Sequence, residues 1–228
     1  MKYNIISLVL VVLFYSCGNE RELQLPQINK AAITEIQDVS AAYLFYDETQ
    51  PDSVLLNRKN LISTTNWLVN VDKRLTLKQA IPHIKFLQDK KKSSSHKNEK
   101  AKNYFTCHDL SINNLGFLEF TSTNYNVEKP KIIPSDISDL KHSGNIHTVN
   151  FEPNEDIFIS PGHSPGINIA TDKKELTNEI KKLDTVRGRI TLNFHKNLKF
   201  GDYILYKSLL SNINLNHLSI SNQEYLYN

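Results

Sequence analysis

Residues 190–220 read ITLNFHKNLKFGDYILYKSLLSNINLNHLSI, and this stretch predicts a strand, a helix and a second strand in succession. Its first part alternates apolar and polar side chains, with Ile190, Leu192 and Phe194 on one face, which is the period of a half-buried strand. Gly201 and Asp202 interrupt this extended run. Apolar and aromatic residues then recur at helical spacing, namely Tyr203, Leu205, Tyr206, Leu209 and Leu210. Residues 215–220 supply the closing strand.

The same pattern occurs earlier in the chain. An offset of 123 residues lays residues 67–87 over residues 190–210. The identical pairs are Asn70/Asn193, Lys73/Lys196, Leu75/Leu198, Ile81/Ile204 and Leu87/Leu210. A tandem duplication and a single continuous α+β domain both account for this pattern, and both stay open at this point.

The remaining elements complete an α+β interpretation. Residues rich in β-formers between turn signals predict further strands at 41–46, 53–57, 67–72, 104–110, 116–123, 156–160 and 167–170. Helical spacing predicts a helix over 76–88, in which Pro82 favours a kink or a later start, and a helix that begins near Asp172. We therefore expect two small lobes, each a β-sheet backed by one or two helices.

Composition narrows the class of protein. The chain has 228 residues, a formal net charge of +3 and seven glycines. It contains no glycine-rich phosphate-binding motif, and the small positive charge argues against a nucleic-acid partner. The two cysteines, Cys17 and Cys107, cannot form a metal site alone, and the histidines show no metal-ligand spacing. We expect neither a metal nor a cofactor.

The first 17 residues resemble a bacterial lipoprotein signal. Lys2 precedes a short apolar run, and Ser16 stands directly before Cys17. The run is too short to span a bilayer. The resemblance implies removal of residues 1–16 and lipidation of Cys17, and the glutamates that follow are similar to the surface-export signal of Bacteroidota lipoproteins. The alternative is an ordinary secretory signal with an incidental cysteine.

The expected organisation follows from these segments. After the signal peptide comes a tether over 17–30, a first α+β lobe over 31–125, a linker over 126–150 and a second lobe over 151–228. The polar, basic segment 89–102 is expected to be a solvated loop of the first lobe. As an alternative it would contact an anionic membrane surface. Its lysines are Lys90, Lys91, Lys92, Lys97, Lys100 and Lys102.

The second half resembles the periplasmic domain of the ExbD and TolR family. The features that carry the resemblance are the strand at 190–194, the Phe200-Gly201 step, the helix at 203–210 and the strand at 215–220. The resemblance implies dimerisation, peptide binding at a sheet edge or contact with peptidoglycan. Family members carry an aspartate in a membrane helix, and residues 1–17 contain no acidic residue, so motor activity is not implied.

No catalytic group emerges clearly. Cys107 and His108 are adjacent on a predicted strand and therefore point to opposite faces, so they cannot act as a nucleophile–base pair. We expect Cys107 to be a buried structural residue and Trp67 to be a core residue. His163 reads as a loop residue, and Asp72 and His195, which end equivalent strands, are expected to face solvent.

These observations lead to one hypothesis and two alternatives. We expect a membrane-anchored envelope lipoprotein, periplasmic or at the outer membrane surface, that is a non-catalytic interaction or assembly module. Envelope proteins, peptidoglycan or a second copy would be its partners. One alternative is a ligand- or glycan-binding lipoprotein with a site between the lobes. The other is an envelope hydrolase that uses Cys107 or a histidine, with His83 and His195 as the candidate partners of a catalytic cysteine.

Overall fold

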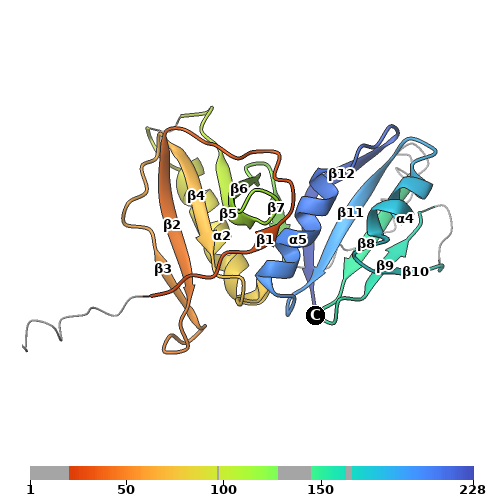
Figure 1. The fold of residues 1–228 in the computed structure, drawn as a ribbon, viewed down its shortest axis with the longest axis horizontal. Helices are drawn as coiled ribbons and strands as arrows, with labels where there is room; N and C mark the ends of the chain where they lie inside the picture. Colours follow the sequence, from red (N-terminus) through yellow and green to blue (C-terminus); the bar gives the residue numbers. More distant parts are fainter. Residues whose placement is uncertain (1–20, 97, 128–144, 163–165) are drawn as a thin grey trace, which may run out of the picture.

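The computed structural model describes residues 21–96, 98–127, 145–162 and 166–228. Within this part the fold is α+β, with two mixed six-stranded sheets and three helices, and Figure 1 shows the sheets side by side. The α+β class and the division into two sheets are therefore confirmed. Cys17, Lys97 and His163 lie outside the described residues.

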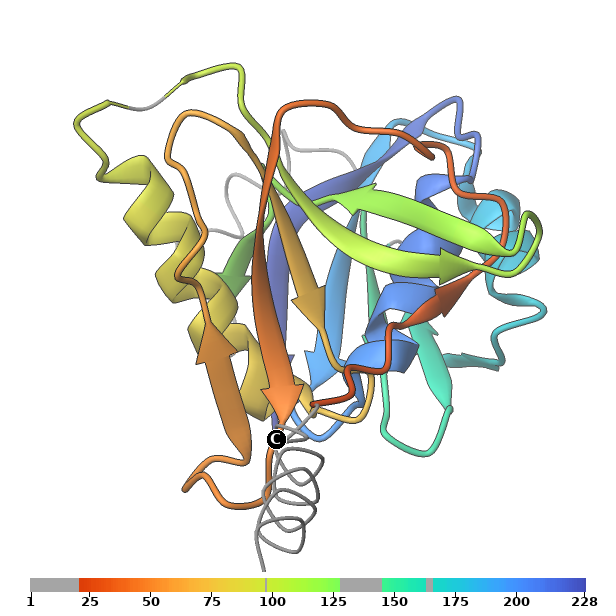
Figure 2. The ribbon, with the colours of Figure 1, turned by 60° about the vertical axis from the view of Figure 1, so that its left-hand side comes forward.

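The first sheet has the strand order β1-β5-β4-β2-β3, and β6 also pairs with β5. Its strands are β1 (Gln27–Ile28), β2 (Val39–Tyr46), β3 (Val54–Asn57), β4 (Asn66–Val71), β5 (Asn103–Asp109) and β6 (Asn114–Glu119). Helix α2 (Leu77–Lys92) connects the parallel strands β4 and β5. Strand β3 lies at the outer edge of the sheet with α2 beside it (Figure 2).

The second sheet has the strand order β10-β9-β8-β11-β12-β7. Its strands are β7 (Asn124–Asn126), β8 (Asn145–Phe151), β9 (Ile157–Ser160), β10 (Ile169–Thr171), β11 (Gly188–His195) and β12 (Leu218–Tyr227). Helix α4 (Leu176–Leu183) precedes β11, and α5 (Phe200–Ser211) connects the parallel strands β11 and β12. The quoted stretch thus folds as strand, helix and strand, as expected, although the closing strand begins at Leu218 and continues to Tyr227.

The two halves repeat one arrangement. In the first, β3-β2-β4-β5 has an antiparallel hairpin followed by two parallel pairings. In the second, β9-β8-β11-β12 has the same order and directions. A helix crosses over from the third strand to the fourth in both. The halves differ after the hairpin, where the second inserts β10 and α4.

Backbone N–H groups at the start of α2 donate to carbonyls in the turn before α5, and N–H groups at the start of α5 donate to carbonyls in the turn before α2. The Leu77 N–H donates to the Leu198 carbonyl at 2.9 Å, and the Phe200 N–H donates to the Leu75 carbonyl at 2.7 Å. The Lys78 N–H to Lys196 carbonyl and Gly201 N–H to Lys73 carbonyl bonds, at 2.8 and 3.1 Å, repeat this exchange. Within each pair of bonds, the donor and acceptor of one bond correspond to those of the other by the offset of 123 residues. Amides that a helix start leaves without an intrahelical partner are thereby satisfied by the other half.

One continuous core joins the halves. The Phe105 ring of β5 stacks on Phe120 with centroids 3.8 Å apart and meets the edge of Phe200 at 5.2 Å. Tyr203 of α5 also contacts Phe105, and its hydroxyl lies 3.2 Å from the Tyr125 hydroxyl of β7. Buried residues of both sheets form a single cluster. The halves are therefore distinct in topology but share their interior.

Several expected boundaries differ from the structure. The range expected to be a tether contains β1, because Ile28 is buried and pairs with the end of β5. Strand β7 ends the expected first lobe but belongs to the second sheet, and β8 begins within the expected linker. Helix α2 runs through Pro82 to Lys92, so the expected basic loop starts four residues later than residue 89.

Candidate binding groove

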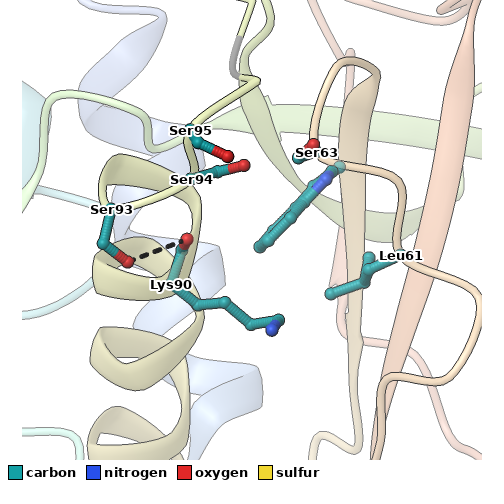
Figure 3. Close-up of a pocket in the computed structure, with 7 residues that line it drawn as sticks. Leu61, Ser63, Lys90, Ser93, Ser94 and Ser95 are labelled. Carbon is teal, nitrogen blue, oxygen red and sulfur yellow. Dashed lines mark hydrogen bonds between the residues drawn. The ribbon is translucent and has the colours of Figure 1, made fainter.

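The first half is hollowed between β3 and the end of α2. Two adjoining hollows of about 460 and 620 Å³ share Leu61 and Lys90. Hydroxyl groups line the first, from Ser63, Ser93, Ser94 and Ser95. In Figure 3, Ser94 and Ser95 face Ser63, and the Lys90 side chain extends toward Leu61. We call the two hollows together the β3–α2 groove.

Four basic side chains line the β3–α2 groove, namely Arg21, Arg58, Lys59 and Lys90. No carboxylate is among the lining residues of either hollow. The apolar part of the lining comes from Leu55, Leu56, Leu61 and Trp67. The groove therefore presents positive charge beside an apolar wall, which favours an anionic partner with an apolar component.

The backbone of β3 is open toward this groove. The Asp47 N–H donates to the Ser53 carbonyl at 3.0 Å, which makes this a hydrogen-bonded pair of the hairpin. Pairs alternate in an antiparallel ladder, so Leu55 and Asn57 bond to β2, whereas the N–H and C=O of Leu56 point away from it. An edge of this kind accepts a further strand.

Contacts between side chains hold α2 along β3. His83 of α2 lies 2.8 Å from the Asp52 carboxylate, just before β3. The Arg58 guanidinium, just after β3, lies 5.0 Å from the centroid of the Phe86 ring of α2. A hydrogen bond from Ser63 Oγ to the His96 carbonyl, at 3.2 Å, connects the next loop to the segment after α2. These contacts connect both walls of the groove within the chain itself.

Lys91 is buried, which corrects its expected role at a membrane surface. Its ammonium donates to the Lys102 carbonyl at 2.9 Å and to Asn103 Oδ1 at 3.0 Å, and it lies over the Trp67 ring. Burial lowers the pKa of Lys91 to about 8. Lys91 closes the core at the end of α2 and is not available to a surface.

The pH dependence of stability is expected to reveal Lys91. Folded Lys91 loses its proton near pH 8, whereas the unfolded side chain does so near 10.5. Between these values the unfolded chain binds more protons, so the free energy of unfolding of the wild type should rise with pH relative to that of Lys91→Met. Chemical denaturation of both proteins between pH 7 and 10 measures this difference. Lys92→Met, at an exposed position, is the control. If the difference in free energy of unfolding from the wild type does not change with pH for either variant, the lowered pKa of Lys91 is refuted.

The other expected surface lysines are dispersed. Lys92 and Lys100 are exposed, and Lys102 forms an ion pair with Glu119 at 2.8 Å. Lys90 lines both hollows. Sequence reasoning missed Arg58, Lys59 and Ser63 as partners of Lys90. The Arg58-Lys59 pair directly after an expected strand was the available signal.

The residues considered for hydrolysis are not brought together. Cys107 is buried, its Sγ contacts the Phe105 carbonyl, and burial raises the pKa of the thiol to about 12. His83 instead contacts Asp52, and the ring of His195 packs against Tyr227. A buried thiol of high pKa is a poor nucleophile. The expectation that Cys107 and Trp67 are core residues is confirmed.

Asp72 is buried, contrary to the expectation that it faces solvent. Its carboxylate accepts hydrogen bonds from the Arg74 side chain at 2.9 and 2.7 Å and from the Gln24 N–H at 3.3 Å. Burial acts to raise the pKa of Asp72, but these bonds outweigh it and hold that pKa below its usual value. The carboxylate thereby anchors the segment that leads to β1.

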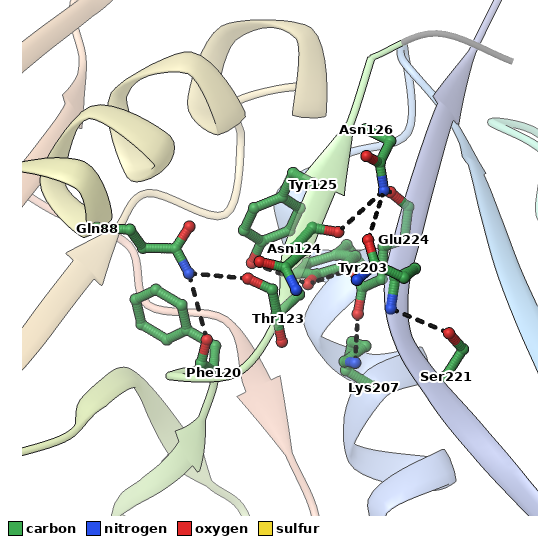
Figure 4. A network of polar contacts seen from close by, with 11 residues as sticks. Gln88, Phe120, Thr123, Asn124, Tyr125, Asn126, Tyr203, Lys207, Ser221 and Glu224 are labelled. Atoms are coloured by element: carbon green, nitrogen blue, oxygen red, sulfur yellow. Dashed lines mark hydrogen bonds and ion pairs between the residues drawn. The ribbon is translucent and has the colours of Figure 1, made fainter. Parts of the chain in front are cut away.

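A third hollow, of about 230 Å³, lies between Asn29 of the first half and helices α4 and α5. This volume is below the range of about 300–1,000 Å³ typical of small-molecule sites. Beside the shared core, Glu224 of β12, Tyr203 and Lys207 of α5 and Tyr125 of β7 form a buried polar network within the second half (Figure 4).

In the part of the chain that the structure describes, no group of three or more His, Cys, Asp or Glu side chains could hold a metal ion. The helices within that same part of the chain are too short or too polar to cross a membrane.

Comparison of the chain with protein-family models, with curated proteins and with solved structures gave no match.

Proposed function

We propose that this protein is a lipid-anchored envelope lipoprotein that acts as a non-catalytic interaction or assembly module, and that the β3–α2 groove is its binding surface. The observation that carries the proposal is an open strand edge beside four basic side chains, Arg21, Arg58, Lys59 and Lys90. Its partners would be envelope proteins, with peptidoglycan as the alternative. The module works by holding a partner, with no chemical step.

The position of the groove supports anchoring close to a membrane. Arg21 lines the groove and follows Cys17 by four residues. Four residues span at most about 14 Å. A diacylglycerol-modified Cys17 would therefore keep the groove near the headgroups, where a module that recruits partners to a membrane has to work.

The order of elements in the second half supports the likeness to the ExbD and TolR periplasmic domain. A hairpin of β8 and β9 is followed by the short strand β10 and then by α4, β11, α5 and β12. The resemblance implies the order hairpin, helix, strand, helix, strand, to which β10 is an addition, and it implies peptide binding at a sheet edge. We propose that the first half provides that edge and that the second half serves as its support.

Replacement of Cys17 by serine is expected to release the protein from membranes. Serine cannot form the thioether that carries the lipid, and a single hydrophobic signal core is removed or too short to anchor the chain. Fractionation of cells that express the wild type and Cys17→Ser measures the change. Cys107→Ser is the matched control and should remain with the membrane fraction. A Cys17→Ser protein that still sediments with membranes would contradict lipid anchoring.

Photo-crosslinking in cells tests the groove itself. A photoreactive residue at Lys59 is expected to give discrete protein adducts that weaken when Arg58 and Lys90 are changed to glutamate. The same residue at Lys182, on the exposed side of α4, is the control position. Adducts that are equally strong at both positions, or unchanged by the charge reversal, would argue against the groove as the binding surface.

A further inference from the structure

We infer that the β3–α2 groove takes an extended acidic segment of a partner protein, which pairs antiparallel with the free edge of β3. This inference rests on the proposed function and names its partner class. It depends on three features of the described residues. The second half contains an equivalent strand edge that is already paired, the outer edge of β3 has free backbone groups, and the charged residues that line the groove are all basic.

The second half supplies the template. Its strand β9 is the counterpart of β3, because both pair antiparallel with the first strand of a hairpin at the same place in the strand order. The far edge of β9 is occupied by β10, which runs antiparallel to it with Ile169 opposite Ile159. The second half thus shows how a strand pairs with the edge that corresponds to the free edge of β3.

Among the described residues, no strand of the first half pairs with the outer edge of β3. Residues 161–187 connect β9 to β11 and contain β10 and α4, whose Leu176 and Ile180 are buried. The corresponding connection from β3 to β4 spans only residues 58–65. The hollow lined by Leu55, Leu56 and Leu61 lies beside β3, where the second half places its own chain. A partner segment would replace the missing strand.

The backbone of β3 defines where a partner would pair. The Val54 N–H is already bonded to Asp52 Oδ1 at 3.1 Å. The N–H and C=O of Leu56 point outward, as argued above, so hydrogen bonds to a partner would centre on this residue. Backbone pairing supplies affinity but selects no particular sequence. Selection therefore falls to the side chains around the groove.

Those side chains favour carboxylates. Arg58 and Lys59 directly follow β3, and Lys90 approaches from α2. An added strand that carried Asp or Glu residues would meet all three, whereas a basic one would be repelled. A lipid headgroup would satisfy the charges but would leave the edge amide of Leu56 and the apolar wall unused. The two features together favour a protein segment.

Binding of short synthetic peptides to the purified soluble chain tests the inference. A peptide that alternates glutamate and valine is expected to bind, and its lysine–valine counterpart should not. The double variant Arg58→Glu, Lys90→Glu should weaken binding by about tenfold or more, since close charge pairs contribute at least about 1.4 kcal/mol. Lys173→Glu and Lys182→Glu, on the second half, should leave binding unchanged.

Leu56→Pro separates strand pairing from charge attraction alone. Proline removes an outward N–H and is tolerated on an edge strand, so the variant should stay folded and lose binding about tenfold. If it does not fold, amide exchange of wild-type Leu56 replaces it, with slower exchange expected when the acidic peptide is bound. Equal binding by Leu56→Pro, or unchanged exchange at Leu56, would overturn strand addition.

Two further outcomes would also overturn the inference. One is binding to vesicles that contain phosphatidylglycerol with no binding of the acidic peptide, which would make the groove a headgroup site. The other is concentration-dependent dimerisation abolished by Leu56→Pro, which would make a second copy the occupant. Crosslinks from Lys59 combined with either result would preserve the proposed function and reject only the acidic segment. Absence of those crosslinks would reject both.

Discussion

Replacement of Glu224 by glutamine is expected to lower the free energy of unfolding by about 3 kcal/mol, because it leaves a nearly buried ammonium without its counter-ion. Glu224 is fully buried in β12 and accepts hydrogen bonds from the Tyr203 hydroxyl, at 2.8 Å, and from Lys207. Glutamine has the same size, so the effect reports charge and not packing. Urea denaturation of the two proteins measures it.

The matched control is Glu179→Gln. Glu179 pairs with Lys182 at 2.6 Å on α4, but the Lys182 side chain is 69% exposed. Exposed ion pairs contribute about 0–1 kcal/mol, so this variant should be close to the wild type. Equal losses for Glu224→Gln and Glu179→Gln would contradict the expected cost of leaving the Lys207 ammonium without its counter-ion.

Replacement of Phe105 by alanine is expected to cost about 3–5 kcal/mol of stability, the usual loss for a buried phenylalanine. The ring is 1% exposed and touches Phe120 of its own half and Phe200 and Tyr203 of the other. A cavity in place of the Phe105 ring removes packing contacts with both halves. We therefore expect both halves to lose stability together.

The single tryptophan allows this to be measured. Trp67 lies in the first half, so its fluorescence follows that half, whereas far-ultraviolet circular dichroism follows the whole chain. The two unfolding curves should coincide in the wild type and in Phe105→Ala. Phe86→Ala, at a side chain 45% exposed, is the control and should cost less than about 1 kcal/mol. Separate transitions would show that the shared core does not couple the halves.

Sequence patterns located the strands and helices that bury one face. The periodicity of residues 190–210 predicted β11 and α5, and the same pattern at 67–87 predicted β4 and α2. The patterns did not reveal β1, β7 or β8. Strands β1 and β7 have two and three residues, too few to show a period, and they form only where a remote strand offers an edge.

The candidate groove could be predicted only in part. Lys90 was singled out with the basic segment, but Lys91 beside it is buried, because adjacent residues on a helix point in different directions. Arg58 and Lys59 lie far from Lys90 along the chain and meet it only through the pairing of β3 with β2 and the packing of α2. The number of charged residues in the sequence does not predict that these three side chains lie close together.

Local pattern in the chain was enough to establish an α+β protein with two strand–helix–strand units, because the alternation of apolar side chains is set by neighbours a few residues apart. The shared core, the exchange of hydrogen bonds between α2 and α5 and the open edge of β3 depend on the tertiary structure. Each of these requires residues distant in sequence to meet. Within the part of the chain that the structure describes, the edge of β3 is open because its connection to β4 is too short to contain a covering strand, whereas the longer connection after β9 supplies β10.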